Sequence, residues 1–401
     1  MNTLDVVKTL FPEDVRSKIW IVGGTVRDLL MGREGDDIDL DAALTPDELI
    51  TYGFRPVDPV TSAPIWFRFI PEVGKFEITR LNNPAELTGD IFRRDFTVNA
   101  LALTLDGELV DLVNGRQDVV QKILRTCTSD SLQDDPIRIF RAFRFETEGW
   151  HLAPEAEELI SARSWENELT RIPTERFSRE MLKALKGAKP VNFFRSMIRF
   201  GVGNTYLPEL FRMPVIPAGP RDKHPEGDLF THACEVLERV AMLTSDPLTR
   251  FCAFFHDLGK LATSPELFPR HHGHEDAGFD LAREFCNRLC LSATHRTALM
   301  WICRLHGNAG HWQELRDATK IRMADQARRA GIVDILPLIA AGDKPDGRDM
   351  PRWTEAVCAV GMSTQQLGIE RDKLEAMPVD KRADYVLQKR IEWLRQGGIS
   401  G

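Results

Sequence analysis

The sequence predicts an α+β protein, in which a mixed α/β N-terminal part precedes a mostly α-helical remainder. Residues 19–24 form an apolar run that ends at two glycines, and the alternating residues 36–40 follow after a helical stretch. Two further apolar runs within residues 100–112 flank a polar turn, which predicts a β-hairpin. From about residue 128 to 212 the apolar spacing is helical. The strands are therefore expected near the N-terminus and helices elsewhere.

Length and composition set the broad class of the protein. A chain of 401 residues, 43% of them hydrophobic and 28% charged, can bury large cores and is expected to form two or three domains. We expect no membrane partner and a cytoplasmic location, because the sequence shows neither a long apolar segment nor a secretory signal. Its seven cysteines are scattered, which argues against a disulfide framework. Since the net charge is −8, any RNA has to meet local basic patches.

The glycine pair suggests a phosphate cradle. Gly23 and Gly24 allow a ligand to approach the backbone closely. The helix that begins there presents unpaired N–H groups, which suit a phosphate. We therefore expect this turn to hold a nucleoside triphosphate.

Two carboxylates on the next strand predict a metal site. Asp37 and Asp39 share one face of a strand, while Ile38 and Leu40 point to the core. Such a pair can hold Mg²⁺, and paired metal ions suit phosphoryl transfer. Glu77, on the predicted strand 76–80, offers a third acid. A solvated turn is the competing interpretation of Asp-Ile-Asp taken alone.

Taken in order, these motifs resemble those of the class II tRNA nucleotidyltransferases, the bacterial CCA-adding enzymes and their poly(A) polymerase relatives. The stretches that carry the resemblance are 22–30, 36–40 and 93–100. The resemblance covers most of the chain and implies a polymerase beta-like nucleotidyltransferase head that uses Mg²⁺, with tRNA, CTP and ATP as partners. It also implies a set of nucleotide contacts: Gly23, Gly24, Arg27, Arg94, Asp95 and Asn99. We expect residues 93–99 to be helical, with Asp95 and Asn99 one turn apart.

A second polar stretch predicts how a base is selected. Asp135 and Arg138 lie about one helical turn apart, so the carboxylate can accept from the amino group of cytosine or adenine while the guanidinium donates to ring acceptors. The resembled family assigns this role to a Glu-Asp-x-x-Arg motif, in which Asp134 replaces the glutamate here. Arg141 and Arg144 continue the same face and are further candidates for nucleotide binding. A solvated arginine stripe is the alternative.

The C-terminal half contains an adjacent pair, His256-Asp257, preceded by a separate histidine and followed by further His and Asp residues. This pattern resembles the HD phosphohydrolase superfamily. The candidate metal ligands are His232, His256, Asp257, His274, His306 and Asp343. Imidazoles and carboxylates together suit a divalent transition metal or Mg²⁺, which can activate water against a phosphoester. The resemblance implies phosphatase and 2′,3′-cyclic phosphodiesterase activity, and Lys260 is a candidate contact for substrate phosphate.

The motifs and the breaks between them predict five parts. These are a catalytic head at 1–127, a helical neck with nucleotide-selecting and RNA-binding elements at 128–212, a linker at 213–227, an HD domain at 228–350 and a helical tail at 351–401.

The leading interpretation is template-independent addition or repair of the 3′-terminal CCA of tRNA from CTP and ATP, with release of pyrophosphate. Residues 81–92 form a shorter segment than the flexible loop of full CCA-adding relatives, so a CC-adding enzyme is the close alternative. Poly(A) polymerase, a protein acting mainly as an HD metal phosphohydrolase, and a catalytically silent RNA-binding protein are further alternatives. The sequence leaves the oligomeric state open.

Overall fold

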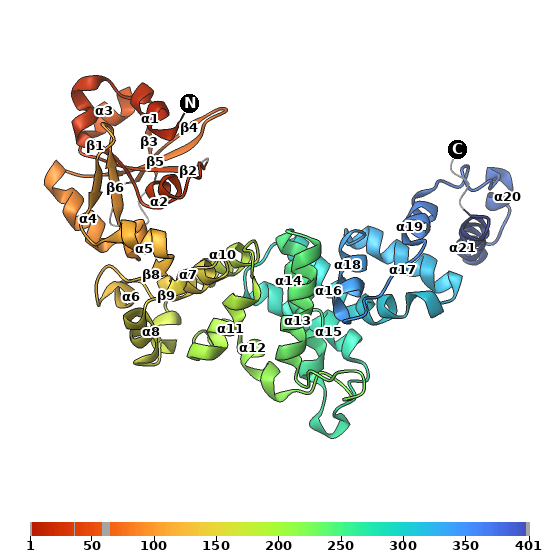
Figure 1. The fold of residues 1–401 in the computed structure, drawn as a ribbon. Coiled ribbons are helices and arrows are strands. Elements are labelled where there is room, and N and C mark those ends of the chain that lie inside the picture. The colour runs from red at the N-terminus through yellow and green to blue at the C-terminus, as the bar shows by residue number, and fades with distance from the viewer. Residues whose placement is uncertain (1, 36, 58–64, 398–401) are drawn as a thin grey trace. The chain divides into compact units, whose positions relative to one another are not determined.

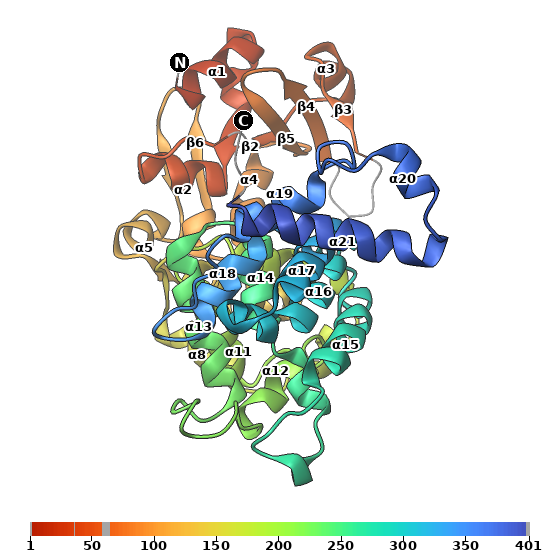
Figure 2. The ribbon, with the colours of Figure 1, turned by 90° about the vertical axis from the view of Figure 1, so that its right-hand side faces the viewer.

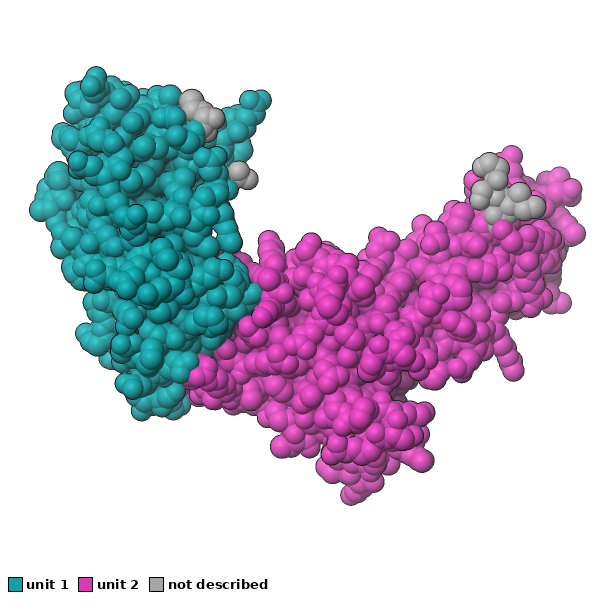
Figure 3. Space-filling view, in the orientation of Figure 1, with its two compact units in different colours: residues 1–165 teal, residues 166–401 magenta. Residues whose placement is uncertain are grey.

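The computed structural model describes residues 2–35, 37–57 and 65–397, so that Asp36 of the predicted carboxylate strand lies outside the described residues. The chain separates into two compact units, Met1–Trp165 and Glu166–Gly401 (Figure 3). Each unit has its own architecture and is described by itself. None of the helices in the described ranges combines the length and apolarity needed to cross a membrane.

A seven-stranded mixed sheet forms the centre of the first unit, with strand order β3-β4-β5-β2-β1-β6-β7 (Figure 1). Strands β2 and β5 pair in parallel, and the other neighbours in this sheet are antiparallel. The strands are β1 (Ile19–Val22), β2 (Asp37–Ala42), β3 (Arg55–Pro56), β4 (Ile65–Ile70), β5 (Gly74–Arg80), β6 (Leu101–Thr104) and β7 (Leu109–Asp111). A separate parallel pair consists of β8 (Ile123–Leu124) and β9 (His151–Leu152).

Helices accompany the strands of this unit. The α-helices are α1 (Thr3–Leu10), α2 (Gly24–Leu30), α3 (Pro46–Thr51), α4 (Leu87–Arg93), α5 (Gly115–Gln121), α6 (Ser131–Asp134), α7 (Ile137–Glu146) and α8 (Pro154–Ser161). The 3₁₀ helices are η1 (Glu13–Lys18), η2 (Pro84–Glu86) and η3 (Thr97–Asn99). The predicted α+β fold with a mixed α/β N-terminal part is confirmed.

Local sequence explains where these strands lie. Strand β1 is buried along its whole length, as its unbroken apolar sequence predicts for a strand at the centre of a sheet. The predicted hairpin is also confirmed: β6 and β7 are antiparallel, and Gly107 supplies the positive φ of 93° in the turn between them. The motifs that follow β1 are thereby fixed at the end of a rigid strand.

The short segment 81–92 is a structured connection in this fold. It forms η2 and most of α4, and the side chain of Glu86 accepts hydrogen bonds from the backbone and side chain of Asn82. Leu87 and Ile91 are buried in a core cluster with Trp20 and Val22 of the central strand. Helix α4 is therefore anchored to the sheet by apolar packing.

The expectation of one helical segment over residues 93–99 is wrong. Helix α4 ends at Arg93, and Arg94 is extended, with φ −68° and ψ 166°. The chain then makes the 3₁₀ turn η3, in which the side-chain amide of Asn99 still donates to Asp95 at 3.0 Å. The pairing survives because a 3₁₀ turn also brings together residues close in sequence.

The second unit is helical (Figure 2). Its first α-helices are α9 (Glu166–Leu169), α10 (Thr174–Ala184), α11 (Val191–Phe200), α12 (Pro208–Arg212), α13 (Leu229–Leu243), α14 (Pro247–Phe255) and α15 (His274–Arg288). They are followed by α16 (Ala293–Gly310), α17 (Asp317–Ala330), α18 (Ile335–Asp343), α19 (Trp353–Gly361), α20 (Arg371–Glu375) and α21 (Val379–Arg395). The 3₁₀ helices are η4 (Met213–Val215), η5 (Leu258–Ala262), η6 (Pro265–Leu267) and η7 (Trp312–Glu314).

Helices that lie far apart in sequence build the core of this unit. Helix α13 packs against α14 and α18, α15 packs against α16, and α17 packs against α19 and α21. The rings of Phe194 and Phe254 stack with centroids 3.8 Å apart, which ties α11 to α14. Within the predicted linker, Ile216 and Ala218 are buried. The five-part division stays a prediction.

Removing the buried side chain of Ile91 should destabilise the first unit. Ile91→Ala leaves a cavity beneath α4 and is expected to cost about 2–5 kcal/mol in free energy of unfolding, measured by urea titration with circular dichroism. Ile50→Ala is the control, since Ile50 is 58% exposed and its loss should cost less than about 0.5 kcal/mol. Equal losses in both variants would contradict the packing described.

Candidate functional site

Three carboxylates line one face of the sheet in the first unit. In the parallel pairing of β2 with β5, Asp37 lies opposite Lys75 and Asp39 lies opposite Glu77. Residues at alternate positions of a strand, and their direct partners on the next strand, project to the same face. The structure therefore brings Asp37, Asp39 and Glu77 together, as the sequence predicted, while Ile38 and Leu40 are buried on the other face.

Gly23 lies directly against this carboxylate face. It precedes α2 with φ 69° and ψ −139°, and its N–H donates to the carbonyl of Leu101 at 3.1 Å. A Cβ added at Gly23 would lie 2.6 Å from Nη1 of Arg94 and 3.5 Å from Oδ2 of Asp39. Glycine is thus required both by backbone conformation and by the close approach of two predicted site residues. Gly24 follows as the first residue of α2.

Two acids that the sequence analysis missed hold Arg94 in place. Its Nε and Nη2 donate to Oδ2 of Asp90 at 2.9 and 2.7 Å, and Nη2 lies 3.4 Å from both carboxylate oxygens of Asp41. Burial raises the pKa of Asp41 to about 7, although Arg94 acts against that shift. Asp41 continues the Asp37, Asp39 alternation, so this periodicity was a signal available in the sequence.

The electrostatics of the carboxylate face suit a divalent cation. Burial raises the pKa of Asp39, and the neighbouring Glu77 and Asp37 raise it further, while Arg94 and Lys75 oppose the shift. Lys75 also forms an ion pair with Glu77. The raised pKa means that ionised Asp39 is disfavoured, chiefly by burial, so a bound cation would stabilise it. Hard carboxylate oxygens in this arrangement fit Mg²⁺.

A second polar network joins α2, η3 and α7. Arg27 donates from Nη1 to Oδ1 of Asn99 at 2.6 Å and forms a two-point hydrogen bond with Asp28. Asn99 donates in turn to Asp95, whose other oxygen lies 3.0 Å from Nη2 of Arg141. Burial would raise the pKa of Asp95, but Arg141 and the hydrogen bonds from Asn99 and the Phe96 N–H lower it. Four of the predicted nucleotide contacts thus form one connected network.

Arg144 meets this network through an aromatic ring. Its guanidinium carbon lies 4.3 Å from the centroid of Phe145, and that of Arg27 lies 5.1 Å from the same centroid. Arg144 also pairs with Glu148 at 3.2 Å. The alternative of a solvated arginine stripe is therefore not what the structure shows: Arg141 pairs with Asp95, and Arg144 packs on Phe145 and pairs with Glu148.

The predicted base-selecting pair lies at the start of α7. Asp135 directly follows α6 in an extended conformation, and Asp134, the last residue of that helix, is exposed. Arg138 donates from Nη1 to the carbonyl of Ser131 at 2.9 Å and from Nη2 to that of Arg93 at 2.7 Å. This guanidinium therefore braces the backbone that carries Arg94.

In the second unit, the six predicted metal ligands converge from five helices. His232 lies on α13, His256 and Asp257 follow α14, His274 begins α15, His306 lies on α16 and Asp343 ends α18.

Asp257 faces two pairs of imidazoles with its two oxygens. Oδ2 lies 3.4 Å from Nε2 of His232 and 3.2 Å from Nε2 of His256. Oδ1 lies 3.4 Å from Nε2 of His274 and 3.2 Å from Nε2 of His306. The carboxylate therefore faces two neighbouring candidate sites for a metal ion. One lies beside Nε2 of His232 and His256, and the other lies beside Nε2 of His274 and His306.

Asp343 completes one of these positions. Its Oδ1 lies 3.2 Å from Nε2 of His232 and 3.5 Å from Nε2 of His256. The Nδ1 atoms of these two histidines are directed elsewhere. That of His256 lies 2.8 Å from the carbonyl oxygen of Ala253, and that of His232 lies 2.8 Å from Oε1 of Glu226. Each Nε2 is consequently the atom that faces the carboxylates.

Burial and charge at this cluster fit a metal ion. Nε2 of His232, Nε2 of His256 and Oδ1 of Asp257 are buried and make no hydrogen bond within the described part of the chain. Burial lowers the pKa of His232, but Asp257, Asp343 and Glu226 outweigh it and raise this pKa to about 10. A carboxylate field that strong favours a cation, and imidazole with carboxylate is a donor set for transition metals or Mg²⁺.

Three residues near this cluster have contacts that the sequence analysis did not foresee. Oε1 of Glu226 lies 2.8 Å from Nδ1 of His232 and 2.8 Å from Nδ1 of His224. Lys260 lies 2.7 Å from Oδ2 of Asp257 and donates to the carbonyl of Ala218 at 2.6 Å. Because Lys260 is buried and already bound, this position does not support a contact with substrate phosphate.

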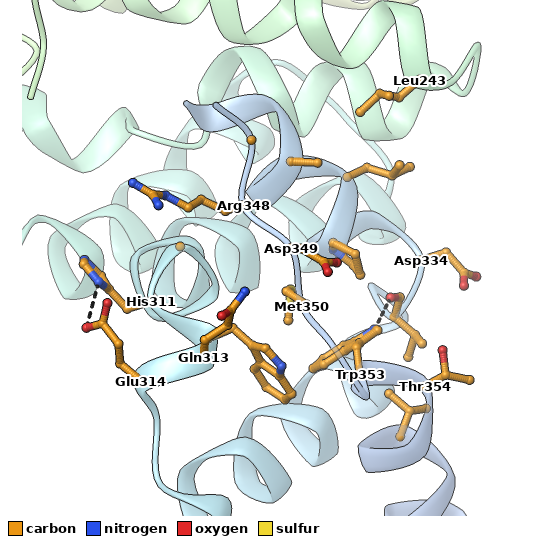
Figure 4. A pocket seen from close by; sticks show the side chains of 18 of the residues that line it. Leu243, His311, Gln313, Glu314, Asp334, Arg348, Asp349, Met350, Trp353 and Thr354 are labelled. Atoms are coloured by element: carbon orange, nitrogen blue, oxygen red, sulfur yellow. Dashed lines mark hydrogen bonds and ion pairs between the residues drawn. The ribbon is translucent and has the colours of Figure 1, made fainter. Parts of the chain in front are cut away.

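A cavity of about 1090 Å³ lies elsewhere in this unit (Figure 4). Trp312, Trp353 and the residues Asp346–Met350 are among those that line it, and none of the predicted metal ligands does so among the described residues. The indole N–H of Trp353 donates to the carbonyl of Val333 at 2.9 Å. The cavity is therefore distinct from the candidate metal centre.

Comparison with protein-family models assigns both units. Residues 19–59 and 67–125 match the "Poly A polymerase head domain", and residues 149–213 match the "Probable RNA and SrmB- binding site of polymerase A". Residues 229–336 match the "HD domain". Together with the fold, these matches define a nucleotidyltransferase of the poly(A) polymerase type that carries an HD domain.

Known relatives narrow this class to one family. The multifunctional CCA protein of Methylococcus capsulatus is 34% identical over 332 residues, covering 77% of this chain and 76% of that protein. The multifunctional CCA protein of Teredinibacter turnerae is 32% identical over 326 residues, covering 76% of this chain and 78% of that protein. The chain belongs to the multifunctional CCA protein family.

Solved structures support the same fold at lower identity. The CCA-adding enzyme of Thermotoga maritima complexed with tRNA has a TM-score of 0.64 at 20% identity, covering 97% of this chain and 90% of that one. The Bacillus stearothermophilus CCA-adding enzyme in complex with CTP also has a TM-score of 0.64 at 20% identity, covering 99% and 94%.

The contact between Gly23 and Arg94 can be tested with a pair of glycine variants. Gly23→Ala should displace the Arg94 guanidinium and weaken binding of CTP or ATP about tenfold or more, measured by isothermal titration calorimetry with Mg²⁺. Gly32→Ala is the control for a positive φ: Gly32 has a φ of 68°, but a Cβ there would meet no heavy atom within 4 Å among the described residues. Equal effects in the two variants would show that contact with Arg94 is not responsible.

Proposed function

We propose that the first unit transfers nucleotides from CTP and ATP to the 3′ hydroxyl of tRNA, so that the chain synthesises or repairs the terminal CCA and releases pyrophosphate. The observation that carries this proposal is the face formed by Asp37, Asp39 and Glu77, with Gly23 and Arg94 directly against it. Membership of the multifunctional CCA protein family and the tRNA, ATP and CTP named for fold relatives support the same reaction.

Asp37, Asp39 and Glu77 would hold Mg²⁺ at this face. The ion supplies charge stabilisation for the attacking oxygen and for the leaving pyrophosphate. Arg94 is held within reach of the same site by Asp90 and Asp41, so its guanidinium is oriented before the nucleotide binds.

We assign the triphosphate and sugar to the residues around α2 and η3. Gly23 and Gly24 carry no side chain, which lets the guanidinium groups of Arg94 and Arg27 lie close to the start of α2. Arg27 is also fixed by Asp28 and Asn99. An arginine held by neighbouring side chains loses little further freedom when it binds a phosphate, which favours tight and specific contact.

Asp135 and Arg138 are proposed to select the base. Support comes from the position of Arg138, whose hydrogen bond to the carbonyl of Arg93 links the start of α7 to the Arg94 backbone. A carboxylate and a guanidinium placed beside the phosphate site match the donor and acceptor pattern of cytosine and adenine. Arg141 and Arg144 then support this element through Asp95 and Phe145.

Addition of only two C residues is the second candidate. Residues 81–92 are taken up largely by η2 and α4, and Leu87 and Ile91 are buried in the core. A segment anchored in this way has little length left to move with an incoming ATP. The full CCA product is favoured by the relatives, and the anchored segment favours the CC product.

The HD domain of the second unit is proposed to hydrolyse phosphoesters such as phosphate monoesters and 2′,3′-cyclic phosphates. His232, His256, Asp257, His274, His306 and Asp343 would hold Mg²⁺ or a transition metal ion. Such ions supply an activated water. Asp257 would contribute both of its oxygens, because each faces a different pair of imidazoles. We place both reactions in the cytoplasm.

Product length decides between the two nucleotide-addition candidates. The protein is incubated with Mg²⁺ and tRNA lacking its 3′ end, with CTP alone, ATP alone or both, and products are resolved to single nucleotides. We expect two additions with CTP and a third only when ATP is also present. A stop after two C residues would establish the CC-adding alternative, long A tails would establish poly(A) polymerase, and no addition would contradict the proposal.

A further inference from the structure

Residues 216–228, the loop that precedes α13, are folded onto the HD cluster, which is the set of six candidate metal ligands in the second unit. The Ala218 N–H donates to the carbonyl of Gly227 at 2.9 Å, and the Leu229 N–H donates to that of Ile216 at 2.8 Å, which closes the loop at its base. Lys260 donates to the carbonyl of Ala218 at 2.6 Å and so fixes the loop from the metal side. The side chains of this loop therefore have defined positions beside the candidate ligands.

Glu226 of this loop connects to His232 on one side and to His224 on the other. Both Nδ1 atoms lie 2.8 Å from the same oxygen, Oε1 of Glu226. Nε2 of His224 lies 3.0 Å from Nζ of Lys344, the residue that follows the candidate ligand Asp343. His224 and His232 are both buried, and Glu226 and Lys344 are partly buried.

The chemistry of Lys344 and Glu226 fixes the direction of every hydrogen bond in this network. A lysine ammonium can only donate, so Nε2 of His224 accepts from Lys344 and the proton of that imidazole lies on Nδ1. An ionised carboxylate can only accept, so Nδ1–H of His224 and Nδ1–H of His232 both donate to Glu226. Nε2 of His232 is then the atom that faces Asp257 and Asp343, and it would offer its lone pair to a metal ion bound there.

We propose that Glu226 is a positioning residue of the HD centre that locks His232 in the tautomer able to bind a metal through Nε2, with His224 and Lys344 holding the carboxylate in place. The proposal rests on the metal centre put forward above. A carboxylate that accepts from a ligand imidazole fixes the ring and raises its basicity. Because Lys344 follows Asp343, the same network also links the first ligand of the cluster to the last.

The network is better explained as a positioning device than as a further metal site, although His224, Glu226 and His232 lie close enough to be considered for one. One oxygen of Glu226 already serves both imidazoles at hydrogen-bond distance. The outer nitrogen of His224 faces the ammonium of Lys344, and a cation placed here would be repelled by that charge.

Metal affinity in the full chain tests the proposal. The parent protein carries Asp39→Asn, which weakens metal binding in the first unit, and every variant is made in this parent. Mn²⁺ affinity is measured from the electron paramagnetic resonance signal of the free ion. Glu226→Gln keeps an acceptor oxygen without its charge, and Glu226→Ala removes both. Glu314→Gln is the matched control, because Glu314 pairs with Nδ1 of His311 at 3.4 Å on the exposed surface.

We expect Mn²⁺ affinity to fall about 10- to 100-fold in Glu226→Ala and by a smaller factor in Glu226→Gln, with no change in Glu314→Gln. The rise in unfolding temperature that Mn²⁺ produces should shrink in the same order, while the metal-free unfolding temperature of Glu226→Gln stays at that of the parent. Unchanged affinity in both Glu226 variants would overturn the inference. Absence of Mn²⁺ binding to the HD cluster in the parent would instead overturn the metal centre itself.

A steric variant tests the same network without changing a polar group. A Cβ at Gly219 would lie 2.4 Å from Cδ2 of His224, so Gly219→Ala should push this imidazole away from Glu226. We expect weaker Mn²⁺ affinity in this variant, by less than in Glu226→Ala because Glu226 still accepts from His232. Affinity equal to that of the parent would contradict the role given to His224.

Discussion

Crowding of acidic groups that must be offset by cations is the constraint on which both candidate sites depend. In the first unit the pairing of Asp39 with Glu77 across β2 and β5 places two carboxylates on one face, and burial raises the pKa of Asp39. In the second unit Asp257 and Asp343 are directed at the same two imidazoles. Like charges this close are unfavourable in a partly buried setting, so each site is arranged to favour a bound cation.

The two units meet this constraint with different donor sets, and the difference separates their chemistry. Carboxylates on a sheet offer hard oxygen ligands beside Arg94 and the glycine turn, which suits Mg²⁺ and a nucleoside triphosphate. The HD cluster mixes imidazole nitrogens with carboxylates, which extends the choice to transition metals. One polypeptide therefore combines a site suited to forming phosphodiester bonds with a site suited to hydrolysing phosphoesters.

Sequence patterns predicted those features that follow from residue spacing along a single strand. Alternation along β2 was enough to place Asp37 and Asp39 on one face, and the apolar run Ile19–Val22 was enough to predict β1. Asp90 was missed although it precedes Arg94 by only four residues, because residues 81–92 were considered only as a short loop and not as the helix α4 that carries Asp90. The helix expected over residues 93–99 was wrong because Arg94 turns away from α4 into an extended conformation.

The same limit explains the residues missed around the HD cluster. His224 and Glu226 lie among prolines and glycines, a composition typical of a linker, and only the folding of that loop onto α13 reveals their contacts. The motif His256-Asp257 was recognisable because the two residues are adjacent. Its geometry, with each carboxylate oxygen facing a different pair of imidazoles, depends on four helices meeting.

The central claim is that each unit carries its own metal-dependent reaction. The most direct test compares Asp39→Asn and His256→Ala for addition of nucleotides to tRNA and for hydrolysis of a 2′,3′-cyclic phosphate, with Asp106→Asn at the exposed β6–β7 turn as control. The account predicts that Asp39→Asn abolishes only addition, that His256→Ala abolishes only hydrolysis and that the control keeps both. Loss of both activities in either site variant, or retention of addition by Asp39→Asn, would contradict it.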